Sequence, residues 1–231
     1  MRVFAISDLH LSVNNPKPMD IFGPAWDNYV EKVFSDWKEK VSDDDVVVMA
    51  GDFSWAMKLE DTKKDLELFK NLPGKKIMIR GNHDYWWNTI SAVRKALPKD
   101  FFAIQNDAIK IENVIFCGTR GWLLPDENFS QENQKIFDRE VIRLEMTLQS
   151  AQALKKDGDK IICLMHYPPT NNTKENTKFT DLFEKYNVEK VVFGHIHAKR
   201  NVELFFEKNG IEYFLTSCDL LNQKLVLIEE V

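Results

Sequence analysis

The sequence predicts an α/β protein folded as a single domain over residues 1–231. Short, wholly apolar runs alternate along the chain with longer stretches whose apolar residues recur at helical spacing. Several of these runs end directly in Asp, Asn or His. A chain of 231 residues is long enough for one large, well-buried core, and no linker, repeat or low-complexity tract divides it.

The first part of the chain alternates buried strands with helices. We expect strands at residues 3–6, 46–49 and 77–79, and helices over residues 26–41, 66–72 and 90–97. Pro73-Gly74 and Pro98 end the second and third of these helices, because proline and glycine do not continue a helix well.

The second part of the chain mixes hairpins with further strands and helices. Asn-Asp and Glu-Asn breaks predict antiparallel strands at 102–104, 108–111 and 114–117. Next come a long helix over 130–156, a buried strand at 161–165, a short helix around 179–183 and a buried strand at 191–193. Asn209-Gly210 is a strong turn signal for a hairpin of 202–206 with 211–215, and a last strand is expected at 225–228.

The composition is that of an ordinary soluble globular protein, with 44% hydrophobic and 29% charged residues. A net charge of −5 provides no general basic field for nucleic acid, although two bound divalent cations would offset most of that charge locally and admit an anionic substrate. The three cysteines stand singly inside apolar runs, as buried thiols in a reducing compartment do. The start of the chain does not resemble a signal peptide and no run is long enough to span a membrane, so we expect a cytoplasmic protein.

Five short polar blocks share one position in the predicted fold. They are Asp8-Leu9-His10, Gly51-Asp52, Gly81-Asn82-His83-Asp84, His166 and Gly194-His195-Ile196-His197. Each follows the carboxyl end of a predicted core strand, the edge at which loops of an open α/β sheet converge on a ligand. A single Asp-x-His or Gly-Asp is most often only a polar strand exit, but here the blocks together use all five histidines of the chain. This pattern predicts a metal centre, and carboxylate, imidazole and amide ligands without thiolate suit Mn, Fe, Zn or Co.

In the identity and order of these blocks, which span residues 8–197, the chain resembles the calcineurin-like binuclear metallophosphoesterases. The resemblance implies a four-layer α-β-β-α sandwich of two mixed β-sheets with flanking helices. It implies one metal ion held by Asp8, His10, Asp52 and His197, and a second held by Asp52, Asn82, His166 and His195. Asp52 would then bridge the two ions. Such a pair, about 3.5–4 Å apart, lowers the pKa of a shared water and neutralises phosphoryl oxygens during in-line attack on a phosphomonoester or phosphodiester.

His83 matches the catalytic histidine of the family, which is not a metal ligand, and an imidazole beside the ions can protonate the leaving oxygen. The chain departs from the protein-phosphatase branch, where an Asp three residues after the Gly-Asp ligand supports this histidine. Trp55 stands at that position here, so the protein-phosphatase subclass is not expected. Asp84 either orients His83 in its place or only fixes the turn.

The sequence indicates the substrate less clearly than it indicates the metal centre. Arg80 and Arg120 follow predicted strands and either contact a phosphate or form ordinary surface ion pairs. Five of the six tryptophans lie in or next to the loops with the polar blocks: Trp26, Trp55, Trp86, Trp87 and Trp122. They either plug loops onto the core or, as we expect for Trp55 and Trp86, form a wall for a nucleotide-like or lipid-like phosphoester. A nuclease of the same chemistry would need a basic track, and a non-catalytic scaffold would be expected to lack some of these residues.

Overall fold

The computed structural model describes residues 1–14, 16–198 and 202–231. Within them the strands form two mixed sheets, one in the order β11-β1-β2-β3-β4 and the other in the order β5-β6-β7-β8-β10-β9. In the first, β11 is antiparallel to β1 and the other neighbours are parallel. In the second, the outer strands β5 and β9 are antiparallel to their neighbours and the four inner strands are parallel.

The elements of the first sheet and its helices are β1 (Arg2–Ala5), η1 (Asp20–Phe22), η2 (Pro24–Trp26), α1 (Tyr29–Lys40), β2 (Val46–Met49), α2 (Lys63–Leu68), β3 (Lys75–Met78), α3 (Ile90–Ala96), β4 (Phe101–Ala103) and β11 (Val226–Glu230). Those of the second are β5 (Ala108–Ile111), β6 (Val114–Thr119), α4 (Gln131–Leu154), β7 (Lys160–Met165), α5 (Lys178–Lys185), β8 (Lys190–Phe193), β9 (Phe205–Lys208) and β10 (Ile211–Leu215).

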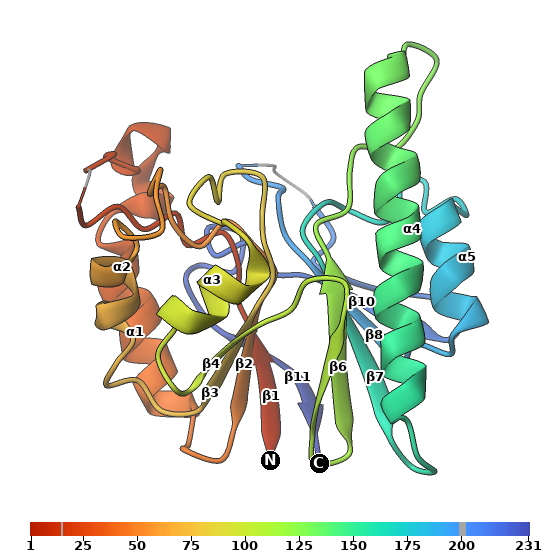
Figure 1. The fold of residues 1–231 in the computed structure, drawn as a ribbon. Helices are drawn as coiled ribbons and strands as arrows, with labels where there is room; N and C mark the ends of the chain where they lie inside the picture. Colours follow the sequence, from red (N-terminus) through yellow and green to blue (C-terminus); the bar gives the residue numbers. More distant parts are fainter. Residues whose placement is uncertain (15, 199–201) are drawn as a thin grey trace.

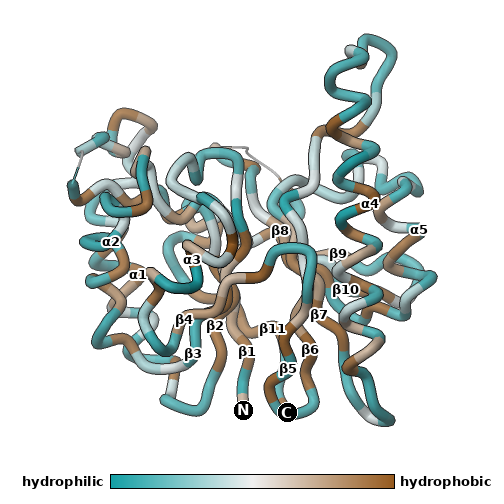
Figure 2. The backbone as a smooth tube through the Cα atoms, viewed as in Figure 1, coloured by the Kyte–Doolittle hydropathy of each residue, from teal (hydrophilic) through white to brown (hydrophobic). Residues whose placement is uncertain are grey.

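The two sheets pack face to face with helices on both outer sides (Figure 1). Side chains alternate across each strand, so Val47 packs under α1 and α2 while Val46 and Val48 enter the core between the sheets. On the other side, Cys163 faces α4 and α5 while Leu164 faces the first sheet. Figure 2 shows the resulting pattern, with hydrophobic stretches along the central strands and hydrophilic stretches at the turns and outer surfaces. The four-layer prediction is confirmed.

One predicted pairing is wrong. Residues 102–104 were expected to pair antiparallel, but β4 lies parallel to β3, with Ile77 opposite Phe102. The helix α3 supplies the crossover that a parallel connection needs, and a short apolar run does not reveal which way it pairs. The predicted antiparallel pairing of β5 with β6 and the Asn209-Gly210 hairpin are confirmed.

Some element boundaries also differ from the sequence prediction. Trp26 lies in the short η2 turn before α1 and not in the helix itself. The long helix begins where expected, because the Ser130 side chain accepts a hydrogen bond from the Asn133 backbone N–H and caps it. The hairpin strand β9 begins at Phe205, later than predicted.

The sheets are joined where their parallel strands end. The backbone N–H of Ser7, just after β1, donates to the Thr216 carbonyl just after β10, at 2.8 Å. The Cys218 N–H in turn donates to the Ser7 carbonyl at 3.0 Å. This junction brings the loops that follow β1, β2, β3, β7 and β8 to one edge of the molecule. No helix among the described residues is both long enough and apolar enough to cross a membrane.

Candidate metal centre

The loops at this edge bend at four of the residues that the sequence singles out. Asp8, His10, Asp52 and His195 have positive φ angles of 59°, 47°, 52° and 71°. Residues other than glycine adopt this left-handed backbone uncommonly, and such positions concentrate at functional sites, where surrounding contacts hold them. These bends turn side chains from both sheets toward one region.

Two glycines let the loops approach the carboxylates closely. A Cβ atom on Gly81 would lie 2.1 Å from Asp52 Oδ1, and one on Gly194 would lie 2.2 Å from Asp8 Oδ2. Any larger residue would therefore push the loop away from the carboxylate beside it. The glycines of the Gly-Asn-His and Gly-His-x-His blocks are needed for this approach.

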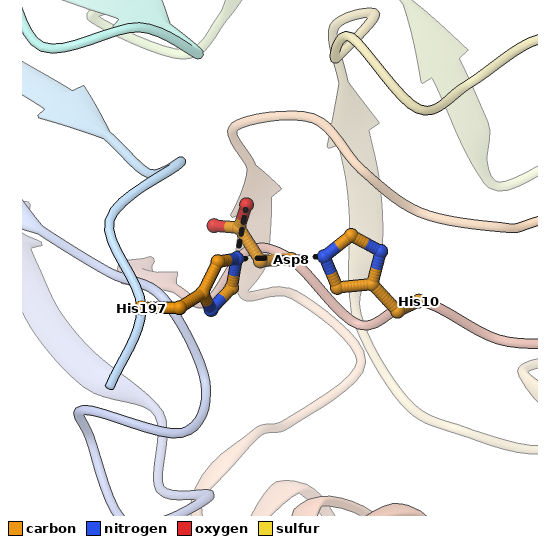
Figure 3. A group of neighbouring side chains, drawn as sticks. All are labelled: Asp8, His10 and His197. Carbon is orange, nitrogen blue, oxygen red and sulfur yellow. Dashed lines mark hydrogen bonds and ion pairs between the residues drawn. The ribbon is translucent and has the colours of Figure 1, made fainter. Parts of the chain in front are cut away.

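Asp8, His10 and His197 form the first group of ligand-type side chains, with one possible ligand atom from each lying within 4.8 Å of the others (Figure 3). His197 Nε2 is 3.4 Å from Asp8 Oδ1 and 3.4 Å from His10 Nε2. Residues that are 187 positions apart in the sequence thus converge on one point.

The second group consists of Asp8, Asp52 and His166, whose possible ligand atoms also lie within 4.8 Å of one another. The Asn82 side-chain oxygen is 2.6 Å from His166 Nε2 and 2.8 Å from His195 Nδ1. Asp52 Oδ2 lies between the groups, 3.4 Å from His166 Nε2 and 3.8 Å from His10 Nε2. All seven residues expected as metal ligands are therefore together in the fold.

Hydrogen bonds from the protein hold both carboxylates, and the His195 backbone N–H donates to both oxygens of Asp8 at 3.1 Å. Asp8 Oδ2 accepts hydrogen bonds from the hydroxyls of Ser7 and Ser217, at 2.6 and 3.0 Å. Asp52 Oδ1 accepts one from the His83 backbone N–H at 2.8 Å. The other oxygen of each carboxylate faces the imidazoles, which is the arrangement expected of oriented metal ligands.

Two imidazoles are oriented in the same way. His166 Nδ1 lies 3.0 Å from the Ala50 carbonyl, and His197 Nδ1 lies 2.9 Å from Asp219 Oδ1. Asp219 was missed from the sequence. The sequence does place this carboxylate shortly after the strand at 211–215, as it places the other ligand-type residues after strands. However, Cys218-Asp219 matches none of the five polar blocks.

The electrostatics of the centre fit a bound cation. Burial, together with the negative charges of Asp84 and Asp8, raises the pKa of Asp52 to about 9. Burial lowers the pKa of His10 to about 3 and that of His166 to about 4. His197 differs, since its hydrogen bonds to Asp219 and Asp8 overcome its burial and raise its pKa to about 10. Ionised carboxylates and neutral imidazoles are the donor set that a borderline divalent ion prefers, and the charge of a bound ion would keep Asp52 ionised and displace the proton from His197.

Comparison with known proteins identifies the family. A model of the calcineurin-like phosphoesterases matches residues 1–199. The chain belongs to this family.

Solved structures show the same fold at low sequence identity. The chain is similar to TT1561 of Thermus thermophilus, with a TM-score of 0.59 and 12% identity over 99% of this chain and 98% of the other. It is also similar to AQ665 of Aquifex aeolicus, a protein of unknown function, with a TM-score of 0.52 and 15% identity over 98% of this chain and 95% of the other. No curated protein matches the sequence.

His83 lies beside the two groups of this phosphoesterase and not within them. Its ring centroid is 4.5 Å from that of Trp55 and 5.6 Å from that of His10. The Tyr85 hydroxyl is 3.5 Å from His83 Nδ1. Burial lowers the pKa of His83, with the positive charges of His197 and Lys17 adding to the effect and Asp8 opposing it.

Asp84 is fully buried and holds the loops in place. Its carboxylate accepts hydrogen bonds from the backbone N–H groups of Gly81, Asp52, Phe53 and Ser54 at 2.7–3.1 Å. The Trp86 indole N–H donates to it at 2.9 Å. Among the described residues no hydrogen bond joins Asp84 to the His83 ring. The carboxylate therefore fixes the turn, which is the second of the two roles that the sequence left open.

The aromatic side chains separate into two kinds. Trp86 is only 1% exposed and packs against Phe53 and Trp87, so the structure places it in the core and not on a substrate wall. Trp55 is partly exposed and stacks on His10, with centroids 4.8 Å apart and planes at 23°. Of the two tryptophans expected to contact substrate, only Trp55 borders the centre.

The two arginines expected to contact phosphate lie together beside the centre. Arg80 and Arg120 line one cavity, and the Nε atoms of both are buried without a hydrogen-bond partner among the described residues. The Arg120 guanidinium also lies over the Trp122 ring, 4.7 Å from its centroid.

Proposed function

We propose that residues 1–231 act as one binuclear metallophosphoesterase that hydrolyses a phosphomonoester or phosphodiester. The observation that carries the proposal is the convergence of seven ligand-type side chains from both sheets around Asp52 Oδ2. Membership of the calcineurin-like phosphoesterase family supports a metal-dependent phosphoesterase in general.

Two divalent transition-metal ions, Mn, Fe, Zn or Co, are the cofactors of this proposal. Asp8, His10, Asp52 and His197 would hold one ion, and Asp52, Asn82, His166 and His195 the other. When bound, the pair supplies an activated water nucleophile and neutralises charge on the phosphoryl oxygens. The chain itself fixes the ligands through Ser7, Ser217, Ala50 and Asp219.

His83 is the general acid of this reaction and protonates the oxygen that leaves. It is half-buried beside the ligand groups, and its backbone N–H is anchored on Asp52 at 2.8 Å. Its environment alone lowers its pKa, but an anionic phosphoester next to the ring would favour the protonated form that an acid requires. Trp55 and Tyr85 border the ring and limit where a leaving group can lie.

The test is hydrolysis of panels of phosphomonoesters, phosphodiesters and nucleotides by protein supplied with Mn. We expect chelation to abolish hydrolysis. Asp52→Asn should reduce the rate by at least roughly 100-fold. The two ions stabilise the charge of the transition state by several kcal/mol, and part of this stabilisation is lost when the ligand that they share is weakened. Asp44→Asn removes an exposed carboxylate in the turn before β2, at the opposite end of that strand from Asp52, and is the matched control. Full activity after chelation, or a wild-type rate for Asp52→Asn, would contradict the proposal.

A further inference from the structure

A cavity of about 210 Å³ lies beside the proposed metal centre, between the ends of β3 and β6 and the helix α4. It is smaller than the roughly 300–1,000 Å³ of pockets that hold cofactor-sized ligands, so it suits a compact group. Its charged lining residues are Arg80, Arg120, Arg139, Glu140 and Arg143. The lining thus contains four guanidinium groups and one carboxylate.

The Glu140 carboxylate already has hydrogen-bond and ion-pair partners within the protein. Glu140 is fully buried and accepts hydrogen bonds from the Thr119 hydroxyl at 2.7 Å and the Gly121 N–H at 3.2 Å. It also pairs with Arg143 at 2.7 Å and lies 3.7 Å from Arg120. It therefore neutralises one of the four positive charges and has little capacity left for the others.

Of the other three arginines, Arg120 shares the charge of Glu140 with Arg143, and two have no counter-charge. Arg80 and Arg139 form no ion pair with any other residue that the structure describes. The Nε atoms of Arg80 and Arg120 are buried and have no hydrogen-bond partner within the described part of the chain. Burial and the neighbouring positive charges of Arg80 and Arg143 lower the pKa of Arg120, despite the opposing charge of Glu140. Buried donors without a partner reduce the stability of the folded protein unless an anion accepts their hydrogen bonds.

The cavity is directly connected to the metal-ligand loops. Arg80 precedes Asn82 by two residues, and the Arg120 carbonyl accepts hydrogen bonds from the N–H groups of His166 and Tyr167, at 3.1 and 3.0 Å. The Tyr167 ring packs against His195, with centroids 4.1 Å apart. A ligand in the cavity would therefore lie alongside a phosphoester held at the centre.

We infer that this arginine cavity is a subsite for a second phosphoryl group of the substrate. The inference rests on the proposed function and narrows its substrate to phosphoesters that carry a phosphoryl group beyond the one that is cleaved. A phosphoryl group fits better than a carboxylate, because three uncompensated positive charges match its higher charge and guanidinium groups bind its oxygens bidentately.

The experiment compares binding of two inert probes, methylphosphonate and methylenediphosphonate, to the full-length, metal-loaded protein by calorimetry, with metal content measured after each titration. We expect the wild type to bind the diphosphonate more tightly than the monophosphonate. Arg139→Gln should lower the affinity for the diphosphonate by about tenfold or more, the usual effect of losing a charge-assisted hydrogen bond, and remove most of the preference. Arg139 is exposed and forms no ion pair among the described residues, so this variant is expected to fold.

Lys135→Gln is the matched control, since it removes an exposed positive charge one helical turn away on α4 and outside the cavity. It should keep the wild-type preference. Equal loss in both variants would show only a general charge effect and would overturn the inference. Equal affinity of the wild type for the two probes, with two molecules of monophosphonate bound, would instead indicate a site for free phosphate and would also overturn it.

Kinetics then separate this inference from the proposed function. A nucleoside 3′,5′-bisphosphate should have a lower KM than the matching 5′-monophosphate, and Arg139→Gln should raise the KM of the bisphosphate selectively. If nitrophenyl phosphate is hydrolysed but neither the probes nor the nucleotides show a preference, the subsite is wrong while the phosphoesterase assignment stands. If the diphosphonate preference is present without hydrolysis of any phosphoester, the subsite stands and the proposed function fails.

Discussion

The proposed centre is bordered by two flanks of opposite chemistry. On one side Trp55 stacks on His10 and lies against His83, and Lys17 is placed over the Trp55 ring at 4.2 Å. On the other side the cavity collects four arginines around Glu140. The aromatic flank comes from loops of the five-stranded sheet, whereas the arginine flank is built by both sheets and α4.

Under the proposed function, this difference would orient the substrate. An aromatic wall next to the proposed acid suits the leaving group, which departs with the proton that His83 supplies. The guanidinium cluster on the other flank suits a second phosphoryl group, which in a nucleoside 3′,5′-bisphosphate belongs to the same leaving group as the base. The two flanks would thus contact different parts of one substrate.

Among changes to the two flanks, His83→Ala is expected to reduce the rate of hydrolysis most. A general acid typically contributes ~10²–10⁴-fold, and only where the leaving oxygen needs a proton in the transition state. The variant should therefore slow hydrolysis of an alkyl or sugar phosphoester by that range and slow a nitrophenyl ester much less, because nitrophenolate leaves without a proton. Rates on both esters and metal content are measured on the same preparation.

His166→Ala is the control for this prediction, since it removes a proposed ligand. It should lose metal and slow both esters together. If His83→Ala behaved in this way, His83 would be a metal ligand, and the aromatic flank would no longer carry the acid.

A smaller effect is expected from Trp55→Ala. Aromatic contacts of this type contribute about 0.5–1.5 kcal/mol, so kcat/KM for aryl or nucleotide esters should fall roughly 2–10-fold relative to a small alkyl ester. Trp87→Ala is the comparison, because Trp87 is 4% exposed and packs in the core. It should lower the melting temperature and slow all substrates alike. The same pattern for Trp55→Ala would mean that Trp55 only packs against its neighbours and does not contact the substrate.

The sequence predicts most of the fold because buried strands and helices leave a strong pattern in apolar spacing. It does not predict the pairing direction of residues 102–104, since an edge strand at the end of a crossover looks the same as one in a hairpin. The order of the polar blocks identifies the residues that converge at the strand ends. It does not identify Asp219, whose contact with His197 is created by the tertiary fold.

The arginine flank shows the same limit. Arg80 and Arg120 are noticeable because they follow strands, but Arg139 and Arg143 are ordinary charged residues of a long helix. Only the packing of α4 beside β6 places all four around one cavity. Likewise, Trp86 cannot be separated from Trp55 by sequence, because the Asp84 hydrogen bond that draws its indole into the core is a detail of the folded loop.

Anomalous diffraction from crystals grown with Mn tests the central claim most directly. We expect two peaks per chain, about 3.5–4 Å apart, with Asp52 between them and neither peak in the arginine cavity. His83 should lie beside the peaks and outside the ligand distance of both. A single peak, two peaks without Asp52 between them, or His83 bound to either ion would contradict the account.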